Sequence, residues 1–240
     1  MIAVAAARGR PVRGCVAVLF NVRPIHMNWR RGHGRERAGY HHGNLREALI
    51  DAALQLVAEH GHLGFTFAEA ARAAGVSPAA PYRHFRDRED MLAEMARRGF
   101  ELFAVELERA WDEGRPEPIG AFGNVGRAYL DFARKRPGYY AAMFEAGISS
   151  QANPDLGQAA DRAFGVLRQA AEVVQAKLPK DARPPALMIA LHAWSMAHGI
   201  ATLFSRQQAA AGKLPMSQED LLEAGFLVYL QGAGLGGGSM

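Results

Sequence analysis

Apolar residues recur at helical spacing along most of this chain, and the alternation of apolar and polar residues that marks strands is almost absent. The first clear stretch, residues 44–60, begins at Asn44, a good N-cap residue, and is terminated by the Gly61 that follows it. Leu45 and Leu49 lie on its apolar face. Prolines and glycines mark the joints between further helices, expected near residues 66–74, 77–85, 87–113, 118–135, 137–147, 154–178, 184–210 and 217–231. The chain is therefore predicted to be all-α.

Two short helices joined by a tight turn are expected after the first helix. Thr66 and Glu69 form a capping box that opens the first of them, and Gly75 ends it. Ser77 and Pro78 suit the N-cap and N1 positions of the second. Such a pair is the pattern of a helix-turn-helix, whose second helix enters the major groove of DNA. Closely spaced capped helices also occur in domains that do not bind DNA, so the spacing alone leaves both interpretations open.

A family resemblance separates these interpretations. Residues 44–95, NLREALIDAALQLVAEHGHLGFTFAEAARAAGVSPAAPYRHFRDREDMLAEM, resemble the N-terminal DNA-binding domain of TetR-family regulators. The resemblance implies an all-helical dimer, with three N-terminal helices for DNA and a larger C-terminal helical domain for ligand binding and dimerisation. On this basis we expect a basic arm at residues 1–39, a DNA-binding domain at 40–90, a ligand-binding and dimerisation domain at 91–231, and a flexible tail at 232–240.

Matching the motif residue by residue implies where DNA would be contacted. The expected contacts are Arg46, Thr66, Ser77, Pro78, Ala79, Ala80, Tyr82, Arg83, His84 and Arg88. Thr66 and Arg88 lie at helix N-termini, where backbone amides and the helix dipole favour a phosphate. Tyr82 and His84 would also bind phosphates and set the docking depth. Arg83 carries the longest donor on the second helix and is the candidate for a guanine contact.

The sequence departs from the family pattern at Pro81, where an aliphatic residue is usual. Proline lacks the N–H that would bond to the Ser77 carbonyl, so the recognition helix is expected to open with a looser or 3₁₀ turn. Its tip, residues 77–80, offers thymine methyl contacts more than hydrogen bonds. For Thr66, Ser77 and Asp87, helix capping alone is the alternative role.

The C-terminal half carries a weaker resemblance. The segments KRPGYYAAMF (135–144) and AWSMAHGIATL (193–203) resemble a TetR subgroup with a Trp…His-Gly signature. We expect an apolar ligand pocket lined by Tyr129, Phe132, Tyr140, Phe144, Phe164, Leu191, Trp194 and His198. The alternative for His198 is a buried histidine whose ring nitrogens are satisfied by ordinary hydrogen-bond partners.

The last two helices are expected to form the dimer interface as half of a four-helix bundle. The helix at 184–210 has a face of small residues that would allow close helix approach, made of Ala186, Ala190, Ala193, Ala197 and Ala201. The helix at 217–231 adds an apolar stripe of Leu221, Leu222, Phe226 and Tyr229. Both faces are assigned to the contact between subunits.

The positive charge of the chain lies mainly at its N-terminus. Residues 1–40 carry eight arginines and one acidic residue, Glu36, within a chain of net charge +4. Arginine-rich arms favour polyanions such as nucleic acid or anionic lipid. Met27 is an alternative start site, in which case part of this arm would not belong to the protein.

Several other classes of protein lack support in the sequence. Cys15 is the only cysteine, so a disulfide framework and a cysteine-based metal site are excluded. His192 and His198 diverge on a helix and make a poor metal pair. Phosphate-loop and nucleophile-elbow motifs are absent, and we expect no catalytic residues, no metal and no cofactor. The uncharged stretch 184–205 is interpreted as a buried helix, with no membrane contact and a cytoplasmic location.

Together these features predict a ligand-responsive regulator. Its expected partners are a palindromic double-stranded DNA operator, a small apolar effector and a second copy of the chain, and the expected mode is repression relieved by the effector. A transcriptional activator, a ligand-independent DNA-binding protein of the same fold, and a helical enzyme are the alternatives.

Overall fold

The computed structural model describes residues 45–61, 64–149, 153–180, 183–207 and 215–233, all of which lie in one unit of the chain, residues 41–240. The expected arm at 1–39 lies outside the described residues. The α-helices are α1 (Leu45–His60), α2 (Phe67–Ala73), α3 (Arg88–Trp111), α4 (Pro118–Lys135), α5 (Pro137–Phe144), α6 (Pro154–Lys177), α7 (Ala186–Gln207) and α8 (Gln218–Gly232). Two short 3₁₀ helices are η1 (Pro81–Arg83) and η2 (Asp112–Gly114). No strand occurs in the described ranges, and the predicted all-α fold is confirmed.

The ends of α1 and α2 follow the capping signals in the sequence. Gly61 has a φ of 76° and Gly75 a φ of 71°, a left-handed conformation that glycine adopts at little steric cost. The Thr66 hydroxyl accepts from the backbone N–H of Glu69 at 3.2 Å, and the Glu69 carboxylate accepts from the N–H of Thr66 at 2.8 Å. The predicted capping box is therefore confirmed.

The segment expected as the recognition helix is not an α-helix. Residues 78–80 form turns and η1 follows them. The Ser77 carbonyl accepts from Ala80 N–H at 2.9 Å, and the Pro81 carbonyl accepts from His84 N–H at 2.9 Å, both over three residues. Because Pro81 has no N–H, the bond from residue 81 to Ser77 that an α-helix needs cannot form. The expected α-helix at 77–85 is thus wrong: turns and a bend at residues 78–80 lead into a 3₁₀ helix that covers only Pro81–Arg83.

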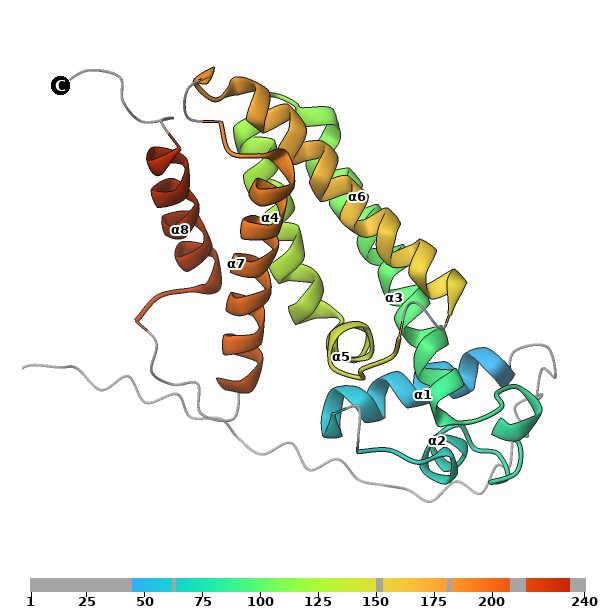
Figure 1. The fold of residues 1–240 in the computed structure, drawn as a ribbon. Helices are drawn as coiled ribbons and strands as arrows, with labels where there is room; N and C mark the ends of the chain where they lie inside the picture. The colour runs from blue at the N-terminus through green and yellow to red at the C-terminus, as the bar shows by residue number, and fades with distance from the viewer. Residues whose placement is uncertain (1–44, 62–63, 150–152, 181–182, 208–214, 234–240) are drawn as a thin grey trace, which may run out of the picture. The chain divides into compact units, whose positions relative to one another are not determined.

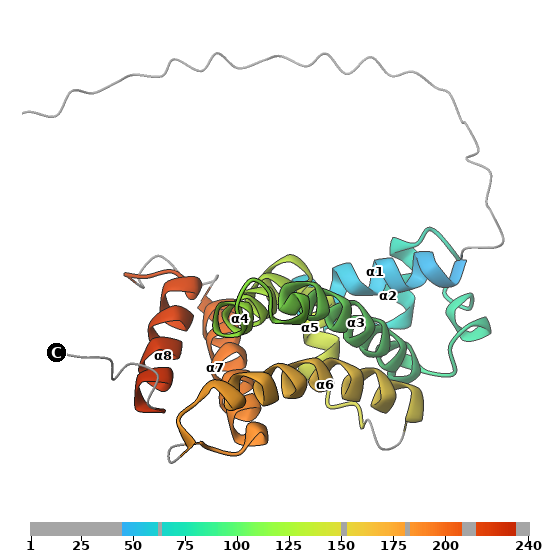
Figure 2. The same cartoon turned by 90° about the horizontal axis from the view of Figure 1, so that it is seen from above.

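Helix α3 connects the N-terminal helices with the rest of the described unit. Near its start it packs against α1, and farther along it packs against α4, α5 and α6 (Figures 1 and 2). Phe103 and Leu107 of α3 are buried at the centre of this packing. Helix α5 also packs against α1, and a Cβ on Gly138 would lie 2.3 Å from the Leu54 carbonyl oxygen. Only glycine permits this close approach.

Helices α7 and α8 complete the described unit. Helix α7 packs against α4 and α6, and α8 packs against α7 and α4 (Figure 1). Over Ala186–Phe204, α7 is long and apolar enough to span a membrane by length and composition alone, which is weak evidence for a span. Only 28% of this window is buried, so the interpretation of the stretch as a buried helix is wrong.

Candidate functional site

An exposed polar surface follows α2. Ser77, Pro78 and Ala79 are exposed before η1, and Tyr82, Arg83 and His84 are exposed within and after it. The Tyr82 side chain is 65% exposed, while its ring packs edge-on against Phe67 with centroids 5.0 Å apart. The buried Phe67 therefore positions a phenol that is open to solvent. Thr66 is exposed at the N-terminus of α2, with its hydroxyl also donating to Glu69 at 2.9 Å.

Three residues of the expected DNA-contacting set are engaged inside the protein. Ala80 is buried, so the expectation that its methyl group faces base edges is wrong. Arg88 donates from Nε to the Phe65 carbonyl at 3.0 Å, and its guanidinium lies 4.8 Å from the centre of the Phe65 ring. Arg46 lies 5.1 Å from the centre of the Phe85 ring. Arg88 and Arg46 thus brace the N-terminal helices against one another, because one face of each guanidinium is covered by an aromatic ring.

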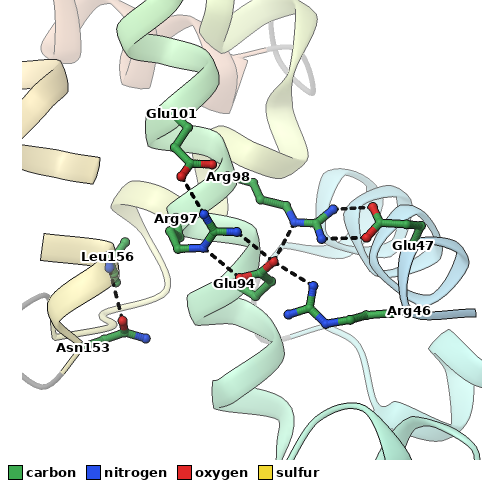
Figure 3. A network of polar contacts seen from close by, with 8 residues as sticks. All are labelled: Arg46, Glu47, Glu94, Arg97, Arg98, Glu101, Asn153 and Leu156. Carbon is green, nitrogen blue, oxygen red and sulfur yellow. Dashed lines mark hydrogen bonds and ion pairs between the residues drawn. The ribbon is translucent and has the colours of Figure 1, made fainter. Parts of the chain in front are cut away.

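A network of ion pairs joins α1 to α3 (Figure 3). The Glu94 carboxylate of α3 accepts from Arg46 Nη1 of α1 at 2.8 Å and from Arg98 Nε at 2.7 Å. Arg98 also bonds to Glu47 of α1, and Arg97 bonds to Glu94. Burial opposes ionisation of Glu94, but these hydrogen bonds outweigh it and hold its pKa at about 2. We did not predict this network. The sequence did contain an indication of it, because Glu94 lies three and four residues before Arg97 and Arg98, a spacing at which side chains on a helix can pair.

Six of the eight residues expected to line a ligand pocket form an aromatic cluster around His198. Nδ1 of His198 lies 2.9 Å from the Tyr129 hydroxyl and 3.0 Å from the Tyr140 hydroxyl. Burial lowers the pKa of His198, which favours a neutral ring whose Nδ1 is shared by these two hydroxyl groups. Trp194 lies against Phe144 and Phe164, with centroids 5.9 and 5.4 Å apart. Nδ1 of this half-buried histidine thus has hydroxyl partners, which is the alternative role that the sequence left open for His198.

Two of the expected pocket residues lie outside this aromatic cluster. Leu191 is 48% exposed on the outer side of α7 and is not among the residues that line the cavity between α4, α7 and α8. Phe132 is fully buried against Phe103, with ring centroids 4.9 Å apart, and contributes to the core. Helical spacing placed Leu191 near Trp194, but the neighbouring helices cover only part of the α7 surface.

A cavity of about 210 Å³ lies between α4, α7 and α8, beside the aromatic cluster. Tyr129 and Trp194 are the members of that cluster that also line the cavity. Its wall on α4 includes three glycines that the sequence analysis did not single out, Gly120, Gly123 and Gly126. Glycines spaced three residues apart leave one face of a helix without side chains. This spacing could have indicated the cavity wall from the sequence.

The outer face of α7 and α8 carries exposed apolar side chains. They are Leu187, Met188, Leu191, Leu203, Leu227 and Val228. In contrast, Ala190, Ala197 and Ala201 are buried within this chain. The alanine face that we assigned to the subunit interface therefore packs inside one subunit, and that assignment is wrong. Leu222 is likewise buried and lines the cavity.

Within the described ranges, no group of three histidine, cysteine or acidic side chains could hold a metal ion. The arrangement instead combines an exposed polar turn after α2 with an apolar cavity in the helical body. Both are features of binding sites.

Two family models match the chain. Residues 49–95 match bacterial regulatory proteins of the tetR family, and residues 122–227 match the tetracyclin repressor-like C-terminal domain. The chain is 47% identical over 47 residues to the HTH-type transcriptional regulator BetI of Rhizobium meliloti, covering 20% of this chain and 23% of BetI. It is 28% identical over 100 residues to the uncharacterised HTH-type regulator YobS of Bacillus subtilis, covering 42% of this chain and 51% of YobS. These alignments span about half or less of the curated relatives.

Solved structures match over nearly their whole length. A protein of unknown function from Rhodococcus sp. RHA1 is 31% identical with a TM-score of 0.65, covering 81% of this chain and 98% of that one. The TetR-family regulator PfmR of Thermus thermophilus is 19% identical with a TM-score of 0.61, covering 76% and 97%. FadR of Bacillus subtilis, solved in complex with stearoyl-CoA, is 14% identical with a TM-score of 0.62, covering 78% and 98%. The similarities to PfmR and FadR, both below 25% sequence identity, show a shared fold.

Proposed function

Because the chain belongs to the TetR family of helix-turn-helix transcriptional regulators, we propose that it is a homodimeric repressor that leaves a palindromic operator when a small apolar molecule binds. The observation that carries the proposal is that α3 leads from the exposed turn after α2 to the helices around the cavity. We propose residues 40–90 as the DNA-binding domain and 91–231 as the effector and dimerisation domain, in the cytoplasm. Transcriptional regulators are in general not enzymes, and we assign no catalytic residue.

The DNA contacts are assigned to the exposed residues of the turn and η1. Tyr82 and His84 bind phosphates, and Arg83 contacts a base edge. Ser77 and Pro78 approach the bases with little hydrogen-bonding capacity. Thr66 holds a phosphate through the N-terminus of its helix, where the dipole is favourable. Arg46 and Arg88 take a supporting role, since their guanidinium groups are already bonded within the protein.

The outer face of α7 and α8 is proposed as the dimer interface. Leu187, Leu191, Leu227 and Val228 are each about half or more exposed, a large apolar surface for a single chain. A two-fold axis brings the same patch from each subunit together, so one apolar face covers the other. The dimer would hold its two recognition segments, residues 77–84 of each subunit, roughly 34–36 Å apart, one turn of DNA.

The mechanism is a shift between two spacings of these segments. A ligand in the helical body changes the equilibrium only if it binds better to the spacing that does not fit DNA. Helix α5 provides a physical connection, because it carries Tyr140 of the aromatic cluster and contacts α1 at Gly138. Displacement of α5 would therefore move α1, which the ion pairs join to α3.

The test is footprinting of the full-length protein on the DNA that flanks its own gene, with and without a panel of metabolites. We expect protection of a palindrome by the wild type, and loss of protection when the effector is present. Arg83→Ala is expected to lose protection, whereas Arg168→Ala, an exposed arginine on α6, is the matched control and retains it. Protection that no metabolite in the panel relieves would leave a DNA-binding regulator without the proposed induction.

A further inference from the structure

The cavity between α4, α7 and α8 exists because α4 lacks side chains where it faces its neighbours. A Cβ on Gly126 would lie 3.0 Å from Leu222 Cδ2 of α8, so α8 already packs tightly there. A Cβ on Gly123 would meet nothing closer than Arg127 Nη2, at 3.9 Å. Space therefore remains beside Gly123, and a larger side chain at this position would occupy it without a backbone clash.

The walls of the cavity are aromatic and aliphatic. Phe122 of α4 and Phe226 of α8 lie with ring centroids 5.3 Å apart, and Trp194 of α7 and Tyr129 of α4 lie 6.0 Å apart. All four residues line the cavity. Aromatic rings at such separations present faces and edges against which another flat ring packs favourably.

The polar groups near the cavity leave little for a charged ligand to bind. The Tyr129 hydroxyl is bonded to His198. Among the described residues, the buried side-chain polar atoms without a partner belong to Arg88 and Tyr229, and neither residue lines this cavity. The charged lining residues, Arg127 and Glu223, are exposed and opposite in sign. An ionised group placed deep in the cavity would lose its hydration without a partner, which is costly.

We propose that this cavity binds a flat, uncharged, apolar molecule of roughly ten non-hydrogen atoms. The size follows from the volume, because an apolar cavity of about 150 Å³ accommodates benzene, and this one measures about 210 Å³. Identifying that molecule class as the effector rests on the proposed function. Occupancy of the cavity itself does not, because it is measured without DNA.

The experiment uses naphthalene as the probe and 1-naphthoate as its charged counterpart, titrated into the full-length protein by isothermal calorimetry. We expect naphthalene to bind at one site per chain and naphthoate at least tenfold more weakly. Gly123→Val should weaken naphthalene binding at least tenfold, because the valine methyl groups occupy the cavity. Gly165→Val on α6 is the matched control, since a Cβ there meets no atom within 4 Å and the residue lies outside the cavity. The control should bind naphthalene like the wild type.

Helical circular dichroism and thermal unfolding establish that both variants are folded. The inference is overturned if folded Gly123→Val binds naphthalene as tightly as the wild type, if naphthoate binds as well as naphthalene, or if naphthalene does not bind at all. Failure of the proposed function has a separate signature, since a protein that binds naphthalene but protects no operator would retain the cavity assignment. A protein that protects its operator but binds no naphthalene would retain the regulator and lose the cavity assignment.

Discussion

Glu47 of α1 and Arg98 of α3 form a paired ionic contact, with Arg98 Nη2 2.7 Å from Glu47 Oε1 and Nη1 bonded to the other carboxylate oxygen. The same Arg98 donates from Nε to Glu94. One guanidinium thus holds carboxylates on two helices that are far apart in sequence (Figure 3). Two parallel N–H···O bonds fix direction as well as distance, so the contact sets how α1 lies on α3.

Removal of this guanidinium should destabilise the N-terminal helices. Arg98→Ala leaves Glu47 and the less exposed Glu94 with fewer partners, and we expect a loss of roughly 1–2 kcal/mol in the free energy of unfolding. Urea unfolding followed by circular dichroism measures it. Arg109→Ala, an exposed arginine later in α3, is the matched control and should change stability little. Equal effects of the two substitutions would show that the paired contact contributes nothing specific.

The ionisation of Glu94 should make part of the stability depend on pH. Its pKa is about 2 in the folded protein and near 4.5 ordinarily, so the folded state favours the charged form. The stabilisation is fully present above about pH 4.5 and is lost as the pH falls toward 2. Glu94→Gln should therefore lower the Tm at pH 7, and the difference from wild type should shrink below pH 4.5. A difference that stays constant from pH 7 to pH 3 would contradict this role.

The positions of the helices could be predicted from the sequence because their signals are local. Prolines at N1 and capping residues such as Thr66 act within a single turn, and the expected helix at residues 118–135 matches α4 as observed. The segment around Pro81 was only partly predictable. The missing N–H indicates a loosened first turn, but whether the chain returns to α geometry within the next few residues depends on packing against α2.

The binding surfaces were harder to predict because they depend on which helices meet. Small residues allow close approach of any neighbouring helix, so the sequence could not distinguish α4 and α6 of the same subunit from a second subunit as the partner of Ala197. The stripe of Gly120, Gly123 and Gly126 becomes a cavity wall only because α8 packs opposite it. Aromatic residues around His198 were found because their types and helical spacing coincide with buried positions.

The exposed residues of η1 should separate affinity from specificity. Tyr82→Phe and His84→Ala are expected to weaken binding to all DNA sequences about equally, because phosphate contacts carry no sequence information. Arg83→Ala should instead relax the preference at one operator position by about 1–3 kcal/mol. Binding measured on a set of operator variants at fixed salt distinguishes the two patterns. Uniform weakening by Arg83→Ala would reassign it to the DNA backbone, and an altered operator preference in Tyr82→Phe would reassign Tyr82 to a base.

The outer face of α7 and α8 should hold the dimer together. Leu191 is 48% and Val228 70% exposed, so Leu191→Glu and Val228→Glu place a charge on this surface without disturbing the interior of the subunit. In a symmetric dimer each substitution acts twice, and a carboxylate buried between subunits without a partner is costly.

Val173→Glu on α6 is the matched control, because Val173 is an exposed valine on a different helix. Sedimentation in the analytical ultracentrifuge should show monomers for the first two variants and dimers for the control, all with wild-type helical content. Operator affinity should fall with dissociation, since one recognition segment makes half of the contacts. Dimers of both Leu191→Glu and Val228→Glu at micromolar concentration would place the interface on another surface.

Ala197→Glu, in contrast, puts its charge inside the subunit, where Ala197 is 2% exposed, and should lower helical content rather than yield a folded monomer.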